Sequence, residues 1–319
     1  MMRARRTSSR RAAPAPLSLF LILVAGCAAN EKPAGTERPG AVQTGAPSPA
    51  EVMNATYHGI AEAGGAVTLV DGRWQGAPSV PASAMRPSVQ LAGRTDLSGD
   101  LDGDGVPEAA VFLSAATGGS GVGGYVAVIG RQRSGALRTA TAPVGDRVAV
   151  RDMRIERGQL VLEVVQFGPD DAMCCPGELA TRTWALADTE LREGTPRITG
   201  RLTPELLAGT EWVLRRWNLD EPAPSTPDVT LIYASGRLSG TSGCNGYSAV
   251  VTPGTVPGDV SVGPAAVTRR MCPDSVMAVE ARFLWQLGEV RRFGFLLGQL
   301  ALSYEHAGEH GALLFERRR

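Results

Sequence analysis

The residues best suited to metal chemistry lie in the segment DLDGDGVPE, residues 100–108. Carboxylates stand at alternate positions, and a glycine follows where a calcium loop must turn sharply. Hard oxygen ligands that converge in this way suit a hard divalent cation. The spacing predicts a structural, non-catalytic calcium site whose ligands are Asp100, Asp102, Asp104, the carbonyl of Val106, and Glu108.

The same segment also has the composition of a plain turn, because Asp102-Gly103 and Asp104-Gly105 are turn dipeptides. The twelfth loop position is Val111, where an EF-hand has a bidentate glutamate. The pattern is closer to the short calcium loops between strands in dockerin-like or propeller-type repeats, so we expect a dissociation constant of about 10⁻⁴–10⁻³ M. Four acids in nine residues repel one another without a counter-ion. A calcium loop and an acidic turn both stay open.

Four cysteines beyond the N-terminal segment could form disulfides, and four cysteines allow three connectivities. Pairing Cys244 with Cys272 would close a loop of about 28 residues and stabilise the fold by about 3.5 kcal/mol. The alternative is two buried, reduced thiols. We expect the bond, because the chain carries an export signal and exported proteins meet oxidising surroundings.

Cys174 and Cys175 are neighbours in the segment DDAMCCPG. They could form a vicinal disulfide, remain a thiol pair, or bond to other cysteines, and we expect a structural bridge. A reactive thiol favours a cationic neighbourhood, whereas Asp170 and Asp171 would raise the pKa of a thiol beside them. A redox or hydrolase function based on this pair is therefore the less favoured interpretation.

Other catalytic patterns are missing from the sequence. The histidines are His58, His306 and His310, and no GxSxG, HExxH or P-loop motif occurs. The segment GSGVGG, residues 119–124, matches a dinucleotide-binding pattern by letter. A strand-like YVAVIG follows it where that fingerprint requires a helix, which favours a hairpin loop. We therefore expect a protein that is not an enzyme.

The first 27 residues have the organisation of an export signal. Five arginines precede the apolar run Leu17–Ala25, which is shorter than the roughly 20 residues that span a bilayer. The run ends in Val-Ala-Gly-Cys and resembles a bacterial lipobox, which implies removal of residues 1–26 and attachment of diacylglycerol to Cys27. An ordinary secretory signal with an incidental cysteine is the alternative.

Residues 27–50 are rich in Pro, Gly, Ala, Ser and Thr and show no apolar period, which predicts a disordered tether. Together with the lipobox, the tether predicts a protein held on a membrane of the bacterial cell envelope, on its exported face. Loss of residues 1–26 removes five of the 32 basic residues and no acidic one, which leaves a net charge of −5. This balance argues against a nucleic-acid partner.

The remaining length suggests two domains of mainly β, or α+β, structure. Residues 51–194 read as an antiparallel β-rich domain of short strands with turn signals at Asp71-Gly72 and at 156–158. A linker with the sequence REGTPRITGR, residues 192–201, leads to the second domain, residues 202–319. There, residues 274–290 show three- and four-residue apolar spacing, which predicts one helix, capped by Asp274 or Ser275.

The second domain resembles a META domain of the HslJ-like family. The resemblance lies in GTEW (209–212), SGTSGCNGY (239–247), TRRMCP (268–273), the predicted helix and the final ALLFER strand. It implies an antiparallel, barrel-like sheet with one helix, and members that are often envelope lipoproteins, some linked to stress tolerance. The first domain resembles uncharacterised modules that precede META domains, through NATY (54–57), the acidic loop, TGGSG (117–121) and GPDDAMCCP (168–176).

Taken together, these features predict a non-enzymatic envelope lipoprotein. Its expected function is to bind or scaffold an envelope protein or a small ligand, in support of envelope integrity or stress tolerance. Inhibition of secreted hydrolases and thiol chemistry at Cys174-Cys175 are the alternatives.

Overall fold

The computed structural model describes residues 45–78, 85–118 and 121–318. The predicted signal peptide, Cys27 and most of the predicted tether lie outside the described residues. The folded part begins earlier than predicted, because helix α1 (Pro49–Met53) starts inside the segment assigned to the tether. The Ser48 side chain accepts from the Glu51 N–H, and the Glu51 carboxylate accepts from the Ser48 N–H, which is a capping box.

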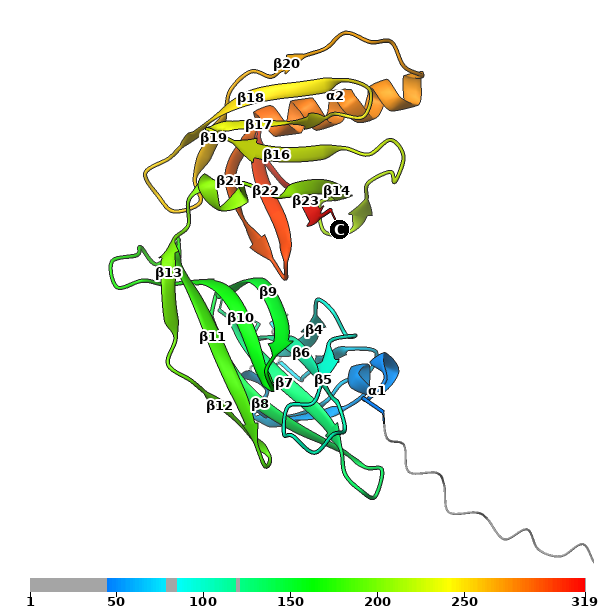
Figure 1. The fold of residues 1–319 in the computed structure, drawn as a ribbon, viewed down its shortest axis with the longest axis vertical. Coiled ribbons are helices and arrows are strands. Elements are labelled where there is room, and N and C mark those ends of the chain that lie inside the picture. The colour runs from blue at the N-terminus through cyan, green and yellow to red at the C-terminus, as the bar shows by residue number, and fades with distance from the viewer. Residues whose placement is uncertain (1–44, 79–84, 119–120, 319) are drawn as a thin grey trace, which may run out of the picture. The chain divides into compact units, whose positions relative to one another are not determined.

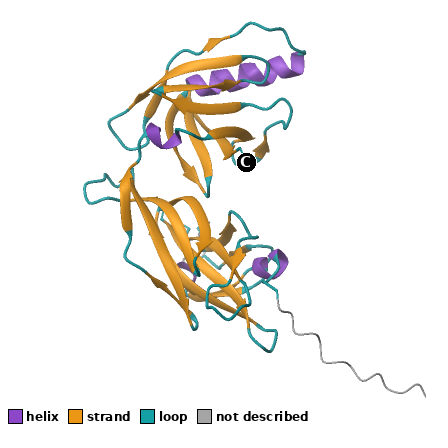
Figure 2. Cartoon of the chain, in the orientation of Figure 1, coloured by secondary structure: helices purple, strands orange, loops and turns teal. Residues whose placement is uncertain are grey.

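Antiparallel sheets dominate the first half of the described chain, with few helical turns among them (Figures 1 and 2). A two-stranded sheet contains β1 (Thr56–Ile60) and β2 (Gly65–Thr68), with the 3₁₀ turn η1 (Ala61–Ala63) between them. A six-stranded sheet has the order β3 (Arg73–Gln75), β4 (Ser88–Ala92), β6 (Glu108–Ala116), β7 (Val122–Arg131), β8 (Leu137–Asp146), with β5 (Ser98–Gly99) paired to β6. A five-stranded sheet has the order β12 (Glu190–Glu193), β11 (Glu178–Ala187), β10 (Gln159–Gln166), β9 (Ala149–Glu156), with β13 (Arg197–Arg201) paired to β11.

The position of β6 between two buried clusters explains why its sequence EAAVFLSA is almost continuously apolar. Successive side chains of a strand point to opposite faces of its sheet. Ala110 and Phe112 pack in one buried cluster with residues of β10 and β11, whereas Val111 and Leu113 pack in another with residues of β1 and β2. Both faces of the six-stranded sheet are therefore covered, and a central strand has no polar face.

Most predicted strands and turns of this half are confirmed. Asp71-Gly72 and Arg157-Gly158 have positive φ at both residues, as a two-residue hairpin turn requires. The linker predicted at 192–201 is wrong in its second half, because β13 pairs with β11 through Arg197↔Thr181 to Arg201↔Glu178. Hydrogen bonding to an existing sheet outweighs the loop-like Gly and Pro content of this segment.

The second half contains one large antiparallel, barrel-like sheet of ten strands (Figure 1). Its order is β19 (Val260–Val262), β18 (Gly246–Pro253), β17 (Arg237–Thr241), β16 (Thr230–Ala234), β14 (Glu211–Trp217), β23 (Glu309–Arg317), β22 (Gln299–His306), β21 (Val290–Leu296), with β15 (Glu221–Pro222) on β14 and β20 (Ala266–Val267) on β18. The 3₁₀ turn η2 (Pro204–Leu207) precedes it. The two end strands approach each other through a bridge between Asp259 and Arg292, which nearly closes the sheet.

Helix α2 (Asp274–Gly288) confirms the predicted helix and packs on this sheet. Phe283 and Leu287 are fully buried in the same apolar cluster as Trp212 and Phe315. The predicted cap is wrong, because the N-cap is Pro273 and no side chain caps the first turn. Proline fits this boundary because its own N–H is missing and its φ is fixed.

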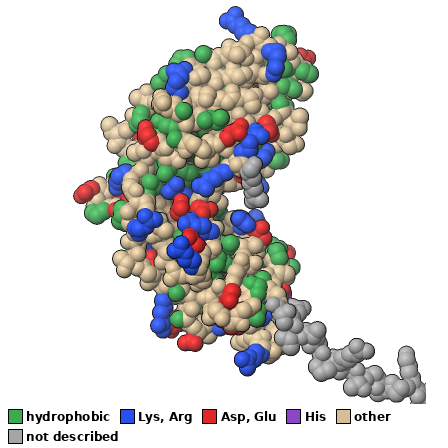
Figure 3. All heavy atoms as spheres, viewed as in Figure 1, with side chains coloured by type: hydrophobic (Ala, Val, Ile, Leu, Met, Phe, Trp, Pro, Cys, Tyr) green, Lys and Arg blue, Asp and Glu red, His purple; other side chains and the backbone are tan. Residues whose placement is uncertain are grey.

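The described residues contain no helix that is both long and apolar enough to cross a bilayer. On the face shown in Figure 3, acidic and basic side chains are interspersed and hydrophobic side chains lie among other residues.

Candidate functional site

The acidic loop joins β5 to β6, and its carboxylates organise its own backbone. Asp100 accepts from the N–H groups of Gly103 (2.7 Å) and Gly105 (3.1 Å), and Asp104 accepts from the N–H of Val106 (2.8 Å). Gly103 and Gly105 have φ values of +80° and +84°, which only glycine adopts without strain. The local sequence therefore folds as the turn that its Asp-Gly pairs predict.

Three of the predicted ligands come together. Oxygens of Asp100, Asp102 and Glu108 lie within 4.8 Å of one another, which is close enough to share one cation. Asp104 is not in this group, and the structure shows its carboxylate only on the backbone of Val106. The donor set of three carboxylates fits a hard divalent ion.

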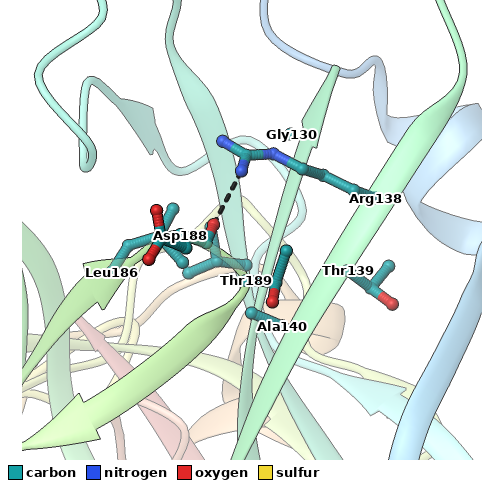
Figure 4. Close-up of a pocket in the computed structure, with 8 residues that line it drawn as sticks. Gly130, Arg138, Thr139, Ala140, Leu186, Asp188 and Thr189 are labelled. Atoms are coloured by element: carbon teal, nitrogen blue, oxygen red, sulfur yellow. Dashed lines mark hydrogen bonds between the residues drawn. The ribbon is translucent and has the colours of Figure 1, made fainter. Parts of the chain in front are cut away.

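Arg138 on β8 is the residue that sequence reasoning missed at this site. Its Nη2 donates to Asp102 and lies 4.0 Å from Glu108, and its Nη1 donates to the carbonyl of Asp188 at 2.7 Å (Figure 4). Gly130 makes room for it, since a Cβ there would lie 3.1 Å from Nε of Arg138. Arg138 follows the loop by 30 residues, so no local signal marks it as a counter-ion.

Glu108 begins β6 and is 2 % exposed. Burial raises the pKa of this carboxyl, and the nearby Asp102 and Asp104 add to the effect. The N–H of Leu101 at 2.8 Å and the charge of Arg138 act in the opposite direction without reversing the shift. A cation at the site would stabilise the carboxylate form and relieve this cost.

The second polar cluster lies under the META motif SGCNGY, where Glu280 of α2 is 6 % exposed. Its Oε2 accepts from Ser242 Oγ (2.6 Å) and the Asn245 N–H (2.8 Å), and its Oε1 accepts from Asn245 Nδ2 (3.0 Å). Asn245 Oδ1 accepts from Thr268 Oγ1 and from the Arg270 N–H. The glutamate therefore binds side chains and backbone of this loop, and Asn245 connects the loop to the TRRMCP segment.

Burial alone would raise the pKa of Glu280. The hydrogen bonds from Ser242 and Asn245 outweigh burial and hold the pKa below its usual value. Glu280 is thus a charged acceptor with its oxygens occupied, and it is ill suited to general acid catalysis, which needs a proton on the carboxyl near neutral pH.

The four cysteines form two disulfides, of which Cys244–Cys272 is the expected pair and Cys174–Cys175 is one of the alternatives that the sequence left open. Cys244 bonds to Cys272 across 28 residues, and Cys174 bonds to its neighbour Cys175. Cys244–Cys272 joins the two META motifs that the Glu280 cluster also connects. The disulfide and the buried glutamate thus hold the same pair of loops.

The glycine-rich segment is explained by packing. Residues 119 and 120 lie outside the described residues, and β7 begins at Val122, so a strand follows as expected. A Cβ on Gly123 would lie 2.1 Å from Oε1 of Glu62, and one on Gly124 would lie 2.7 Å from Cζ of Phe112. These two glycines let neighbouring side chains approach the backbone of β7.

Comparison with known protein families matches residues 205–318 to the META domain model. This part of the chain is a META domain, and the first half is not covered by a family model. A solved NMR structure of a protein from Burkholderia xenovorans is 26 % identical over 36 % of this chain and 85 % of that chain, with a TM-score of 0.30, which supports no further conclusion. No curated protein matches the chain.

Proposed function

We propose that this protein is a non-enzymatic envelope lipoprotein that binds or scaffolds an envelope partner through its folded surface. The observation that supports this proposal is the use of the META polar motifs. Ser242 and Asn245 donate to Glu280 inside the domain, so these side chains stabilise the fold. Because these motif residues bond to the domain's own loop and helix, we infer that the domain acts through its shape and its surface.

The scaffolding proposal is tested in a bacterium that encodes the protein. A deletion strain is complemented with wild type, Glu280→Gln and Cys27→Ser, and survival in detergent is measured after each variant is shown to accumulate. We expect Glu280→Gln to restore survival, because it keeps the fold without an ionisable acid, and Cys27→Ser to fail. Loss of complementation by a correctly folded, membrane-bound Glu280→Gln protein would contradict a non-enzymatic role.

The lipid anchor is part of this proposal and rests on the sequence around Cys27. Cells that express wild type, Cys27→Ser or the matched control Cys244→Ser are labelled with radioactive palmitate. Label is expected in wild type and in Cys244→Ser, and not in Cys27→Ser. An unprocessed, unlabelled wild-type chain in the cytosol would overturn the anchor and the location.

We also propose that the acidic loop holds a structural calcium ion. Asp100, Asp102 and Glu108 would supply the oxygens, because oxygens of these three carboxylates lie within 4.8 Å of one another. With a dissociation constant of about 10⁻⁴–10⁻³ M, 10 mM calcium should stabilise the fold by about 1–3 kcal/mol. Melting curves in calcium and in EDTA measure this, with Asp102→Asn as the variant that should lose the response. If neither addition moves the wild-type transition, Arg138 alone neutralises an acidic turn.

A further inference from the structure

The loop that carries the vicinal cysteines connects β10 to β11 and is closed by one buried carboxylate. Asp171 has a side chain that is 1 % exposed. It accepts from the N–H groups of Gly168 and Gly177, both at 2.7 Å, and pairs with Arg201. The charge of Asp171 is therefore engaged by the two ends of the loop and by a guanidinium, and not by the sulfur atoms.

The two sulfurs have different surroundings. Cys174 is exposed, whereas Cys175 is 2 % exposed. Nη2 of Arg292 lies 3.1 Å from Sγ of Cys175, and Arg147 donates to the carbonyl of Met173 at 2.9 Å. A guanidinium at a sulfur stabilises a thiolate. For Asp171, the structure thus removes the electrostatic objection that the sequence raises.

We propose that Cys174–Cys175 is a thiol–disulfide exchange site for a dithiol protein. A thiolate of the partner attacks the exposed Sγ of Cys174 and forms a mixed disulfide. The Cys174–Cys175 bond breaks, and its electron pair leaves on Sγ of Cys175 as a thiolate that Arg292 stabilises. This activity is independent of the proposed scaffolding function.

The exchange is completed by the second thiol of the partner. Its thiolate attacks the partner sulfur of the mixed disulfide, and Cys174 leaves as a thiolate that takes a proton from water. The partner ends as a disulfide, and Cys174 and Cys175 end as a reduced pair. Two electrons move from the partner dithiol to this chain, and the reverse sequence returns them.

Limited reduction of the processed full chain tests the site. The chain is titrated with dithiothreitol, alkylated, and mapped by mass spectrometry. We expect Cys174–Cys175 to be reduced at lower reductant concentration than Cys244–Cys272, because Cys174 is exposed and Cys244 is buried. Reduction of Cys244–Cys272 first overturns the proposal.

Single-cysteine variants test which sulfur can carry the mixed disulfide. With glutathione disulfide, Cys175→Ser, which keeps Cys174, should form a mixed disulfide at least tenfold faster than Cys174→Ser. Equal rates, in variants whose melting shows that they are folded, would refute the assignment of Cys174 as the sulfur that carries the mixed disulfide.

Arg292 is a positioning residue, and its test uses the rate of reduction by dithiothreitol. Arg292→Gln should slow reduction of Cys174–Cys175 about tenfold, since a hydrogen bond to the leaving thiolate is lost. Arg292→Lys should recover much of the rate, and the matched control Arg291→Gln should match wild type. Because Arg292 also pairs with Asp259 at 2.8 Å, the melting transition of each variant is measured alongside. An unchanged rate in Arg292→Gln would exclude the role of the guanidinium.

Discussion

Three buried carboxylates, Glu108, Asp171 and Glu280, differ in how their charge is stabilised. Asp171 has Arg201 and two backbone N–H groups, and Glu280 has three N–H or O–H donors, so the pKa of each is lowered in spite of burial. Glu108 has one backbone N–H and a more distant guanidinium, and its pKa is raised. The donor count therefore decides the direction of the pKa shift in these three residues, and it marks Glu108 as the carboxylate that would gain most from a cation.

Glu280→Ala should lower the free energy of unfolding by about 3 kcal/mol or more, because it leaves the donors of Ser242 and Asn245 buried and unpaired. Glu280→Gln should cost less, since its carbonyl still accepts. Urea unfolding at pH 7 measures both, with the exposed Glu309→Gln as the control, expected within about 0.5 kcal/mol of wild type. A Glu280→Ala protein as stable as the control would contradict the structural role of the cluster.

The lowered pKa of Glu280 also predicts how the free energy of unfolding depends on pH. The folded-state pKa of Glu280 is lowered, so its stabilisation is fully present above the unfolded value of about 4.3 and is lost as the pH falls through the folded pKa. Glu280→Gln should therefore lose less stability than wild type between pH 5 and more acidic values. If the free energy of unfolding fell equally with pH in wild type and in Glu280→Gln, other groups would dominate acid unfolding.

Glu108 should behave in the opposite sense. Its folded-state pKa is raised, so without calcium its contribution is most favourable below the unfolded value of about 4.3 and is lost as the pH rises through the folded pKa. Calcium binds the carboxylate, and its stabilising effect should therefore grow as the pH rises. Glu108→Gln should be as stable as wild type or more so at pH 7.5 in EDTA, and should not respond to calcium in thermal melts. A calcium response retained in Glu108→Gln would exclude Glu108 as a ligand.

At the residue scale, the sequence predicted which carboxylates of the acidic loop lie together, but not which arginines pair with them. The spacing of the acidic loop correctly placed Asp100, Asp102 and Glu108 together, because they lie within nine residues of one chain segment. It could not show Arg138 or Arg201, which reach their carboxylates from other strands. Pairing across a sheet depends on register, and register is not visible in a local spacing.

At the element scale, hairpin turns were the reliable signal. The turns predicted at Asp71-Gly72 and at 156–158 are confirmed, and Ser235-Gly236 between β16 and β17 forms a turn of the same kind, with φ of 48° and 75°. Strand β8 was missed, because its sequence LRTATAPVGD contains a proline and polar residues. Its alternate residues Ala140, Ala142 and Val144 are nevertheless buried, and the strand pairs along the whole length of β7. Long-range pairing outweighs a weak intrinsic preference here.

Gly240 in β17 provides a sharp test of the barrel-like sheet. A Cβ at this position would lie 2.2 Å from the carbonyl oxygen of Thr230 on β16, and its φ is +156°. We expect Gly240→Ala to destabilise the protein by about 3 kcal/mol or more, since backbone atoms would have to separate. The matched control is Gly236→Ala, where φ is +75° but nothing lies within 4 Å, with an expected cost of about 1 kcal/mol. Thermal or urea unfolding compares the two variants. An equal loss of stability in both would mean that the backbone of β16 moves to accommodate the Cβ without a large energetic penalty.

At the scale of the whole molecule, charge decides how the protein can be held at a membrane. The proposed mature chain has a net charge of −5, and Figure 3 shows acidic and basic side chains interspersed on the visible face. Membrane surfaces are commonly anionic, so electrostatic attraction cannot hold a chain of this balance. In the proposed lipoprotein, the acyl chains on Cys27 would then supply the binding free energy, at about 0.8 kcal/mol per buried CH₂ group.

This argument predicts that a high-salt wash leaves the wild-type protein on membranes. At 1 M salt the Debye length is about 3 Å, so attachment through charge would be released, whereas attachment through acyl chains would persist until detergent is added. Sedimentation of washed membranes followed by immunoblotting measures the two fractions. Cys27→Ser should remain soluble at low and at high salt alike, because without the acyl chains neither hydrophobic nor electrostatic attraction remains. Release of the wild-type protein by salt alone would show instead that a charged partner holds it, and the proposed lipid attachment would fail with it.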